Sequence, residues 1–193
     1  MDLSIFSQLN QLSQLEILIL AVSAILVSYS LLLVYRWIVK DRYLRKVNKT
    51  VKKISCDFFK DISLDLGGEQ YAFFDYLLLS RKGIVALEIK NFSGHIYAAP
   101  GINEWTQIIE RKSYKFTNPF FDLEQKIDLL KQIVPEQDIS GMILFAEQAD
   151  FPKGRPDNVV RINELIGRFG KACSADAASP YLSGWNHLKT HLT

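Results

Sequence analysis

Nineteen consecutive residues near the start of the chain, Ile17 to Tyr35, contain no charged side chain. At a rise of about 1.5 Å per residue, a helix of this length spans roughly 28 Å, which is close to the hydrocarbon thickness of a bilayer. A core helix of a soluble domain rarely stays apolar on all sides over such a distance. We therefore predict a transmembrane helix over residues 17–39. It divides the chain into a short extracytoplasmic segment 1–16, the helix, a basic juxtamembrane helix 40–55 and a folded domain 56–193.

A cleaved signal peptide explains the apolar run less well than an uncleaved anchor does. No Lys or Arg precedes the run, the run is too long for a signal peptide, and no small-residue cleavage site follows it. An uncleaved, single-pass anchor is the prediction.

The charges on either side of the run predict its orientation. Residues 1–35 carry Asp2 and Glu16 and no basic residue, whereas eight basic residues fall between Arg36 and Lys53. By the positive-inside rule, we expect the C-terminal domain to lie in the cytoplasm. Cys56 and Cys173 are then expected to be free thiols, because the cytoplasm is reducing.

The balance of charge also bears on binding partners. The chain has 23 basic and 21 acidic residues, but residues 54–193 alone have 15 basic and 18 acidic ones. Nucleic-acid-binding domains usually show a basic surface, and the clearest basic cluster here lies beside the predicted membrane span. For that cluster, anionic lipid headgroups are favoured over nucleic acid as the partner.

Short apolar segments rich in β-formers alternate with helical patterns in the rest of the chain. Because several of these segments are apolar on both faces, we expect an α/β domain with a mixed central sheet covered by helices on both sides. Trp105 and the sequence YKFTNP are expected to be irregular. The predicted strands lie at 63–66, 71–79, 83–90, 94–100, 141–146 and 158–162. A helix is predicted over 121–134, with helical turns near Leu165 and Trp185.

Three charged residues stand within the two most apolar predicted strands. If residues 80–83 form the turn of a hairpin, Asp75 lies opposite Glu88, and Lys90 points to the same face as Glu88. A shift of one residue would separate the two carboxylates, and Gly83 also suits a bulged turn, so this register is an inference.

Two interpretations of this group remain open. Two neighbouring carboxylates favour a bound cation such as Mg²⁺, which polarises a phosphate and activates water, while a lysine stabilises the charge that develops. Alternatively, Lys90 neutralises one carboxylate in an internal ion pair, which leaves the second carboxylate unmatched.

The residues around the hairpin extend the pattern. Asp75, Gly83, Glu88-x-Lys90-Asn91, Gly94, Trp105 and Asn118-Pro119 occur in that order. In this combination the chain resembles the nuclease-related domain (NERD) family, which is considered part of the PD-(D/E)XK, restriction-endonuclease-like superfamily. The resemblance covers roughly Ile62 to Glu147, and more weakly the segment from Asp157 to Leu165.

The resemblance implies metal ligation by Asp75 and Glu88 and a catalytic role for Lys90. It implies a restriction-endonuclease-like fold, Mg²⁺ or Mn²⁺ as cofactor and nucleic acid, in particular DNA, as the substrate. A membrane anchor just before the domain is a known arrangement in that family.

The chain departs from the family pattern in two places. Where the family has a Glu on the helix before the first strand, this chain has Leu44, and Asp41 is nearly a turn away. The triplet Gly67-Gly68-Glu69 looks like the missing motif, but it falls in a turn after the first strand and does not take that role. Where the family favours a Gln at the start of the later helix, this chain has Asp122, and Gln125 lies one turn further on. Asp122 and Gln125 are therefore candidate auxiliary residues.

Three functions from different classes follow. The first is a metal-dependent enzyme, anchored in the inner membrane of a bacterium, that hydrolyses phosphodiester bonds in nucleic acid. The alternative is a catalytically inactive NERD-like domain that serves as a membrane-attached binding or adaptor module, as the missing Glu, the shifted Gln and the acidic domain would suggest. The third is a structural membrane protein in which the acidic residues of the hairpin make only internal salt bridges. The oligomeric state is not predicted by the sequence.

Overall fold

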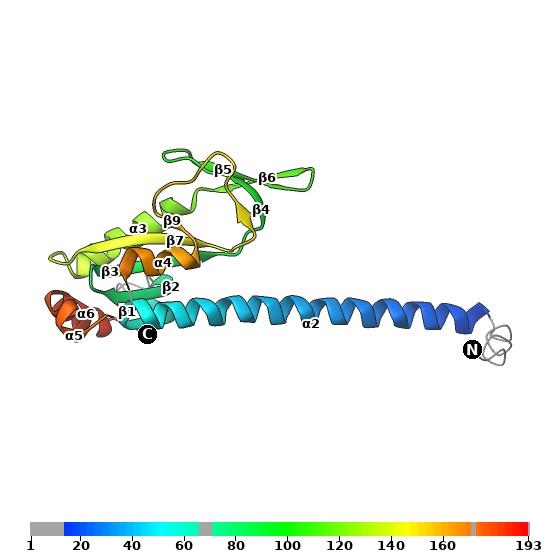
Figure 1. Ribbon diagram of the computed structural model, residues 1–193, viewed down its shortest axis with the longest axis horizontal. Coiled ribbons are helices and arrows are strands. Elements are labelled where there is room, and N and C mark those ends of the chain that lie inside the picture. Colours follow the sequence, from blue (N-terminus) through cyan, green and yellow to red (C-terminus); the bar gives the residue numbers. More distant parts are fainter. Residues whose placement is uncertain (1–13, 66–70, 171–172, 193) are drawn as a thin grey trace. The chain divides into compact units, whose positions relative to one another are not determined.

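The computed structural model describes residues 14–65, 71–170 and 173–192 (Figure 1). The chain divides into two compact units, Met1–Arg45 and Lys46–Thr193. The predicted extracytoplasmic segment lies almost wholly outside the described residues, as do the predicted turn at Gly67-Gly68 and Glu69.

The first unit consists of most of one long helix, α2 (Gln14–Ile54). Its apolar side chains from Ile17 to Trp37 are exposed around the helix, and none of its most apolar window is buried. The hydroxyls of Ser23, Ser28 and Ser30 each donate to a carbonyl three residues earlier, so these polar groups are satisfied within the helix. By length and composition, this helix can cross a membrane.

The second unit contains a five-stranded mixed sheet, as the apolar segments predict. Its strands lie in the order β1-β2-β3-β7-β9; the β1–β2 and β2–β3 pairs are antiparallel, and the β3–β7 and β7–β9 pairs are parallel. Their bounds are β1 (Ser55–Asp65), β2 (Tyr71–Ser80), β3 (Gly83–Lys90), β7 (Ile139–Phe145) and β9 (Val159–Val160).

Both faces of this sheet are covered, which explains why its strands are apolar throughout. On one face α3 (Pro119–Ile133) approaches so closely that a Cβ on Gly141 would lie 2.5 Å from Ile127 Cδ1. On the other face Tyr76 donates its hydroxyl to Asn48 Oδ1 at 2.6 Å, on the last turns of α2. Burial raises the pKa of this tyrosine, and the nearby acidic charges raise it further.

A second, four-stranded sheet follows β3 directly. Its order is β6-β5-β4-β8, and it comprises β4 (Gly94–Tyr97), β5 (Glu104–Ile109), β6 (Lys112–Thr117) and β8 (Ala149–Asp150). The sequence indicates β4 but not the β5–β6 hairpin, because β6 is exposed at nearly every position and shows no apolar alternation. Gly94 at φ 81 is required here, since a Cβ would lie 2.4 Å from the carbonyl oxygen of Ile108.

Short helices complete the chain: α4 (Ile162–Phe169), α5 (Ala175–Ala178), the 3-10 turn η1 (Ser179–Tyr181) and α6 (Leu182–Lys189). Asp57 on β1 holds α6 in place: its Oδ2 accepts from Trp185 Nε1 at 2.9 Å and pairs with Lys189 Nζ at 2.8 Å. Burial alone would raise the pKa of Asp57, but these two contacts lower it below the usual value.

The cysteines correct one expectation. Cys56 and Cys173 are joined by a disulfide and are not free thiols; their Cα atoms lie 4.8 Å apart. The expectation rested on the predicted compartment alone. Pairing depends on the distance between the two Cα atoms, and the fold brings together β1 and the segment before α5, which are 117 residues apart in sequence.

Candidate active site

The β2–β3 hairpin has the register that the sequence predicts. Ser80 pairs with Gly83 and Tyr76 pairs with Leu87, so the numbers of facing residues have the expected sum. The ladder ends there, so the predicted pairing of Asp75 with Glu88 is not part of it. In the next position, the half-buried Asp75 reaches β3 through its side chain, because its Oδ2 accepts a hydrogen bond from the backbone N–H of Ile89 at 2.6 Å.

The strand β2 changes its orientation at Asp75. Residues two apart in a regular strand point to the same face. Yet Phe74 lies under Lys126 of α3, with the ammonium 5.7 Å from the ring centre, while Tyr76 contacts Asn48 on the opposite face. The alternation therefore breaks between them, and the carboxylate of Asp75 turns toward the backbone of β3.

Glu88 lies near the end of β3, on the face that α3 covers. It is 4% exposed, so its charge requires a partner. Lys126 Nζ lies 2.8 Å from Glu88 Oε1, and Lys90 Nζ lies 3.7 Å from Glu88 Oε2. Two ammonium groups therefore flank one buried carboxylate, and a simple pair with Lys90 does not describe the site.

Lys126 is not among the site residues that the sequence predicts. Its position depends on the start of α3, where Asn118 Oδ1 accepts from the backbone N–H of Phe120 and Pro119 occupies the first turn, as the Asn-Pro pair predicts. The available signal is that Lys126 follows Leu123 by three residues and so borders the apolar stripe of the helix.

The two candidate auxiliary residues differ in their surroundings. Asp122 lies one turn before Lys126, and its Oδ2 is 2.9 Å from the Lys126 ammonium. Burial alone would lower the pKa of Lys126, but hydrogen bonds to Glu88 and Asp122 raise it above the usual value. Gln125 is exposed and takes no part in these ion pairs.

Neither of the two positions considered for the family's Glu supplies an acidic side chain that the structure describes. Leu44 lies on α2 in the first unit, and the side chain of Asp41 lies outside the described residues. In the described part of the chain, no group of three or more His, Cys, Asp or Glu side chains gathers.

The comparisons with known proteins bear on the whole region. The family model described as the nuclease-related domain matches residues 38–146, more than half of the chain. The chain belongs to the nuclease-related domain family. An uncharacterized protein of Bacillus anthracis is 32% identical over 63 residues, which are 33% of this chain and 30% of that protein. The match thus spans less than a third of the relative's length, and no solved structure matches.

The donor set of this NERD domain fits a hard divalent cation. Mg²⁺ in enzymes is often held by one or two carboxylates, with water and substrate phosphate as its other ligands. Asp75 and Glu88 supply two carboxylates from neighbouring strands, and Glu88 already attracts positive charge. These two side chains could hold Mg²⁺ or Mn²⁺, and their convergence on one ion stays a prediction.

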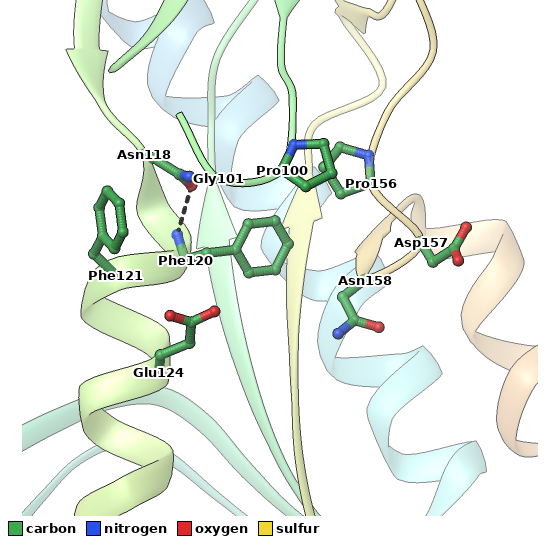
Figure 2. A pocket seen from close by; sticks show the side chains of 9 residues that line it. All are labelled: Pro100, Gly101, Asn118, Phe120, Phe121, Glu124, Pro156, Asp157 and Asn158. Carbon is green, nitrogen blue, oxygen red and sulfur yellow. Dashed lines mark hydrogen bonds between the residues drawn. The ribbon is translucent and has the colours of Figure 1, made fainter. Parts of the chain in front are cut away.

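A cleft of about 410 Å³ lies elsewhere on the NERD domain, at the start of α3 (Figure 2). Phe120 and Glu124 extend into it from α3, and Asp157 and Asn158 line it from the segment before β9. Glu124 and Lys126 point to different sides of the helix, because they are two residues apart. With two carboxylates and no basic side chain in its lining, this cleft does not suit a phosphate group.

Proposed function

We propose that this NERD domain is a metal-dependent nuclease that hydrolyses phosphodiester bonds in DNA, using Mg²⁺ or Mn²⁺. The observation that carries the proposal is the position of Glu88: a buried carboxylate at the end of β3, beside Lys90, on the strand that the Asp75 carboxylate also reaches. The match to the nuclease-related domain model spans residues 38–146, a range that includes these three residues, and this supports the proposal.

Each residue has a distinct role in this proposal. Asp75 and Glu88 bind the cation through their carboxylate oxygens. Lys90, which is 28% exposed, is accessible to a phosphate and stabilises the negative charge that develops on it. When bound, the cation would polarise the phosphate and lower the pKa of a coordinated water.

A second candidate function is an inactive binding or adaptor module. One observation favours it: Lys126 is already paired with Glu88, so the buried carboxylate has a protein partner without any metal. The cleavage assay below distinguishes the two candidates.

We further propose that α2 anchors the domain in the inner membrane of a bacterium, with the domain in the cytoplasm. The uncharged run from Ile17 to Tyr35 and the basic residues from Arg36 to Lys53 support this orientation, and the basic residues would contact anionic lipid headgroups. The Cys56–Cys173 disulfide is an argument for the other side, because disulfides persist mainly in oxidising compartments.

The test is cleavage of DNA by the full-length protein in detergent. Circular and linear DNA are incubated with Mn²⁺ or Mg²⁺ and the wild-type protein, Lys90→Ala or Lys82→Ala. Lys82 is an exposed lysine in the turn of the same hairpin, so its variant is the matched control. We expect wild type and Lys82→Ala to cleave, and Lys90→Ala to be slower by at least about 100-fold, the loss typical of a removed catalytic group.

Two results would contradict the proposal. Equal cleavage by wild type and Lys90→Ala would point to a contaminating nuclease. If the wild-type protein cleaves neither circular nor linear DNA with either metal but retains labelled DNA, the binding module becomes the better description.

A further inference from the structure

We propose that Lys126 is a built-in counter-ion of the metal site. It neutralises Glu88 when no divalent cation is bound, and it shifts to Asp122 when one binds. This inference rests on the proposed function, because it requires a cation site at Asp75 and Glu88.

The contacts of Lys126 provide both positions. Its side chain is 13% exposed, and its ammonium lies between Glu88 Oε1 at 2.8 Å and Asp122 Oδ2 at 2.9 Å. The ammonium therefore already touches a second carboxylate. Asp122 lies one turn away on the same helix, so a small side-chain movement away from Glu88 preserves this second ion pair.

The two carboxylates differ in how much they depend on Lys126. The Glu88 side chain is 5% exposed, and a buried carboxylate without a partner is strongly destabilising. The Asp122 side chain is 60% exposed and is solvated by water. Without metal, Lys126 is therefore required at Glu88; beside a bound divalent cation, the same ammonium is repelled.

Lys90 does not have this arrangement. It follows Glu88 on the same strand at the longer distance of 3.7 Å and is more exposed than Lys126. It remains accessible to a substrate phosphate. We therefore expect Lys126 to weaken metal binding, because its ammonium and the cation repel each other. When no metal is bound, the same ammonium neutralises Glu88.

The test is the affinity of the full-length protein for Mn²⁺, measured by electron paramagnetic resonance of the free ion, and it needs no activity. We expect Lys126→Met to bind Mn²⁺ at least about tenfold more tightly than wild type, because a nearby positive charge is removed. Lys131→Met is the matched control: Lys131 is on the same helix, is 53% exposed and pairs with Asp128. Its affinity should equal that of wild type.

Asp122 provides a second measurement with the opposite sign. We expect Asp122→Asn to weaken Mn²⁺ binding several-fold, because Lys126 then has no second carboxylate to move to. In the Lys126→Met background, the same substitution should have no effect. A loss of affinity that persists in the double variant would make Asp122 a direct ligand and would overturn the proposed role of Lys126.

The outcomes separate the two proposals. If wild type binds Mn²⁺ and Lys126→Met binds it equally or more weakly, the counter-ion role is wrong while the metal site stands. If neither protein binds Mn²⁺, the metal site and the counter-ion role are both wrong. Lys126→Gln retains a hydrogen-bond donor for Glu88 without the charge, so it gives the same comparison if Lys126→Met does not fold.

Discussion

At the scale of single residues, the candidate site consists of a buried carboxylate, Glu88, flanked by the ammonium groups of Lys126 and Lys90. Asp75, Glu88 and Lys90 could be found because strand alternation and the hairpin turn relate their positions locally. Lys126 could not be found in this way. Its contact with Glu88 joins residues 38 apart in sequence and depends on how α3 packs over β3. The bend at Asp75 is likewise a consequence of packing, because Phe74 and Tyr76 contact different layers.

A pH-dependent prediction belongs to Asp57. The pKa of Asp57 is lower in the folded state than in the unfolded state. Its ionised form therefore stabilises the fold at any pH above the unfolded pKa of about 3.9. This stabilisation is lost as the pH falls through the lower pKa of the folded state. Because Asp57 is 42% exposed, we expect Asp57→Asn to reduce the free energy of unfolding at pH 7 by only about 1 kcal/mol. The difference from wild type should shrink as the pH falls below the unfolded pKa and vanish once the carboxyl is protonated in the folded state as well.

Urea unfolding between pH 2.5 and pH 7 measures this effect. Asp128→Asn is the control, since that carboxylate is 72% exposed and lies 3.9 Å from Lys131. A difference between wild type and Asp57→Asn that does not change with pH would contradict the assigned role of the carboxylate.

At the scale of elements, the buried strands could be predicted and the exposed hairpin could not. β2, β3 and β7 are apolar because helices cover both faces of their sheet. The β5–β6 hairpin carries no comparable pattern, and its position depends on Trp105, which stacks on Phe145 of the neighbouring sheet with ring centres 6.2 Å apart. The helix α3 could be predicted to within two residues, because Asn118-Pro119 begins it.

The turn of the β2–β3 hairpin gives a prediction at this scale. Gly83 has φ 107, and a Cβ there would lie 2.2 Å from the carbonyl oxygen of Asp138. We expect Gly83→Ala to lower the free energy of unfolding by more than about 2 kcal/mol, because both the backbone conformation and the space exclude a side chain. Gly167→Ala is the control: it lies within α4 with open space around it, and should stabilise by up to about 1 kcal/mol.

Thermal or urea unfolding of the two variants checks this prediction. If both substitutions have the same effect, the close approach of β3 to residue 138 is wrong.

At the scale of the whole molecule, the sequence predicts a membrane anchor and a domain that is mildly acidic. The uncharged run and the basic residues that follow it favour a cytoplasmic domain, while the disulfide between Cys56 and Cys173 favours an oxidising compartment. The sequence alone could not reveal this conflict, because a pairing across 117 residues becomes visible only in the fold.

Reporter fusions after residue 193 decide the orientation. We expect a fused green fluorescent protein to fluoresce and a fused alkaline phosphatase to be inactive, as for a cytoplasmic domain. The reverse pattern would place the domain, and its disulfide, outside the cytoplasm.

The central claim is that Asp75 and Glu88 hold a divalent cation beside Lys90. A crystal structure of the full-length protein grown with Mn²⁺ tests it most directly through the anomalous signal of the metal. We predict an anomalous peak within ligand distance of both carboxylates, with the Lys126 ammonium on Asp122 and away from Glu88. A structure with no peak at these carboxylates, and with Lys126 still paired to Glu88, would contradict the account.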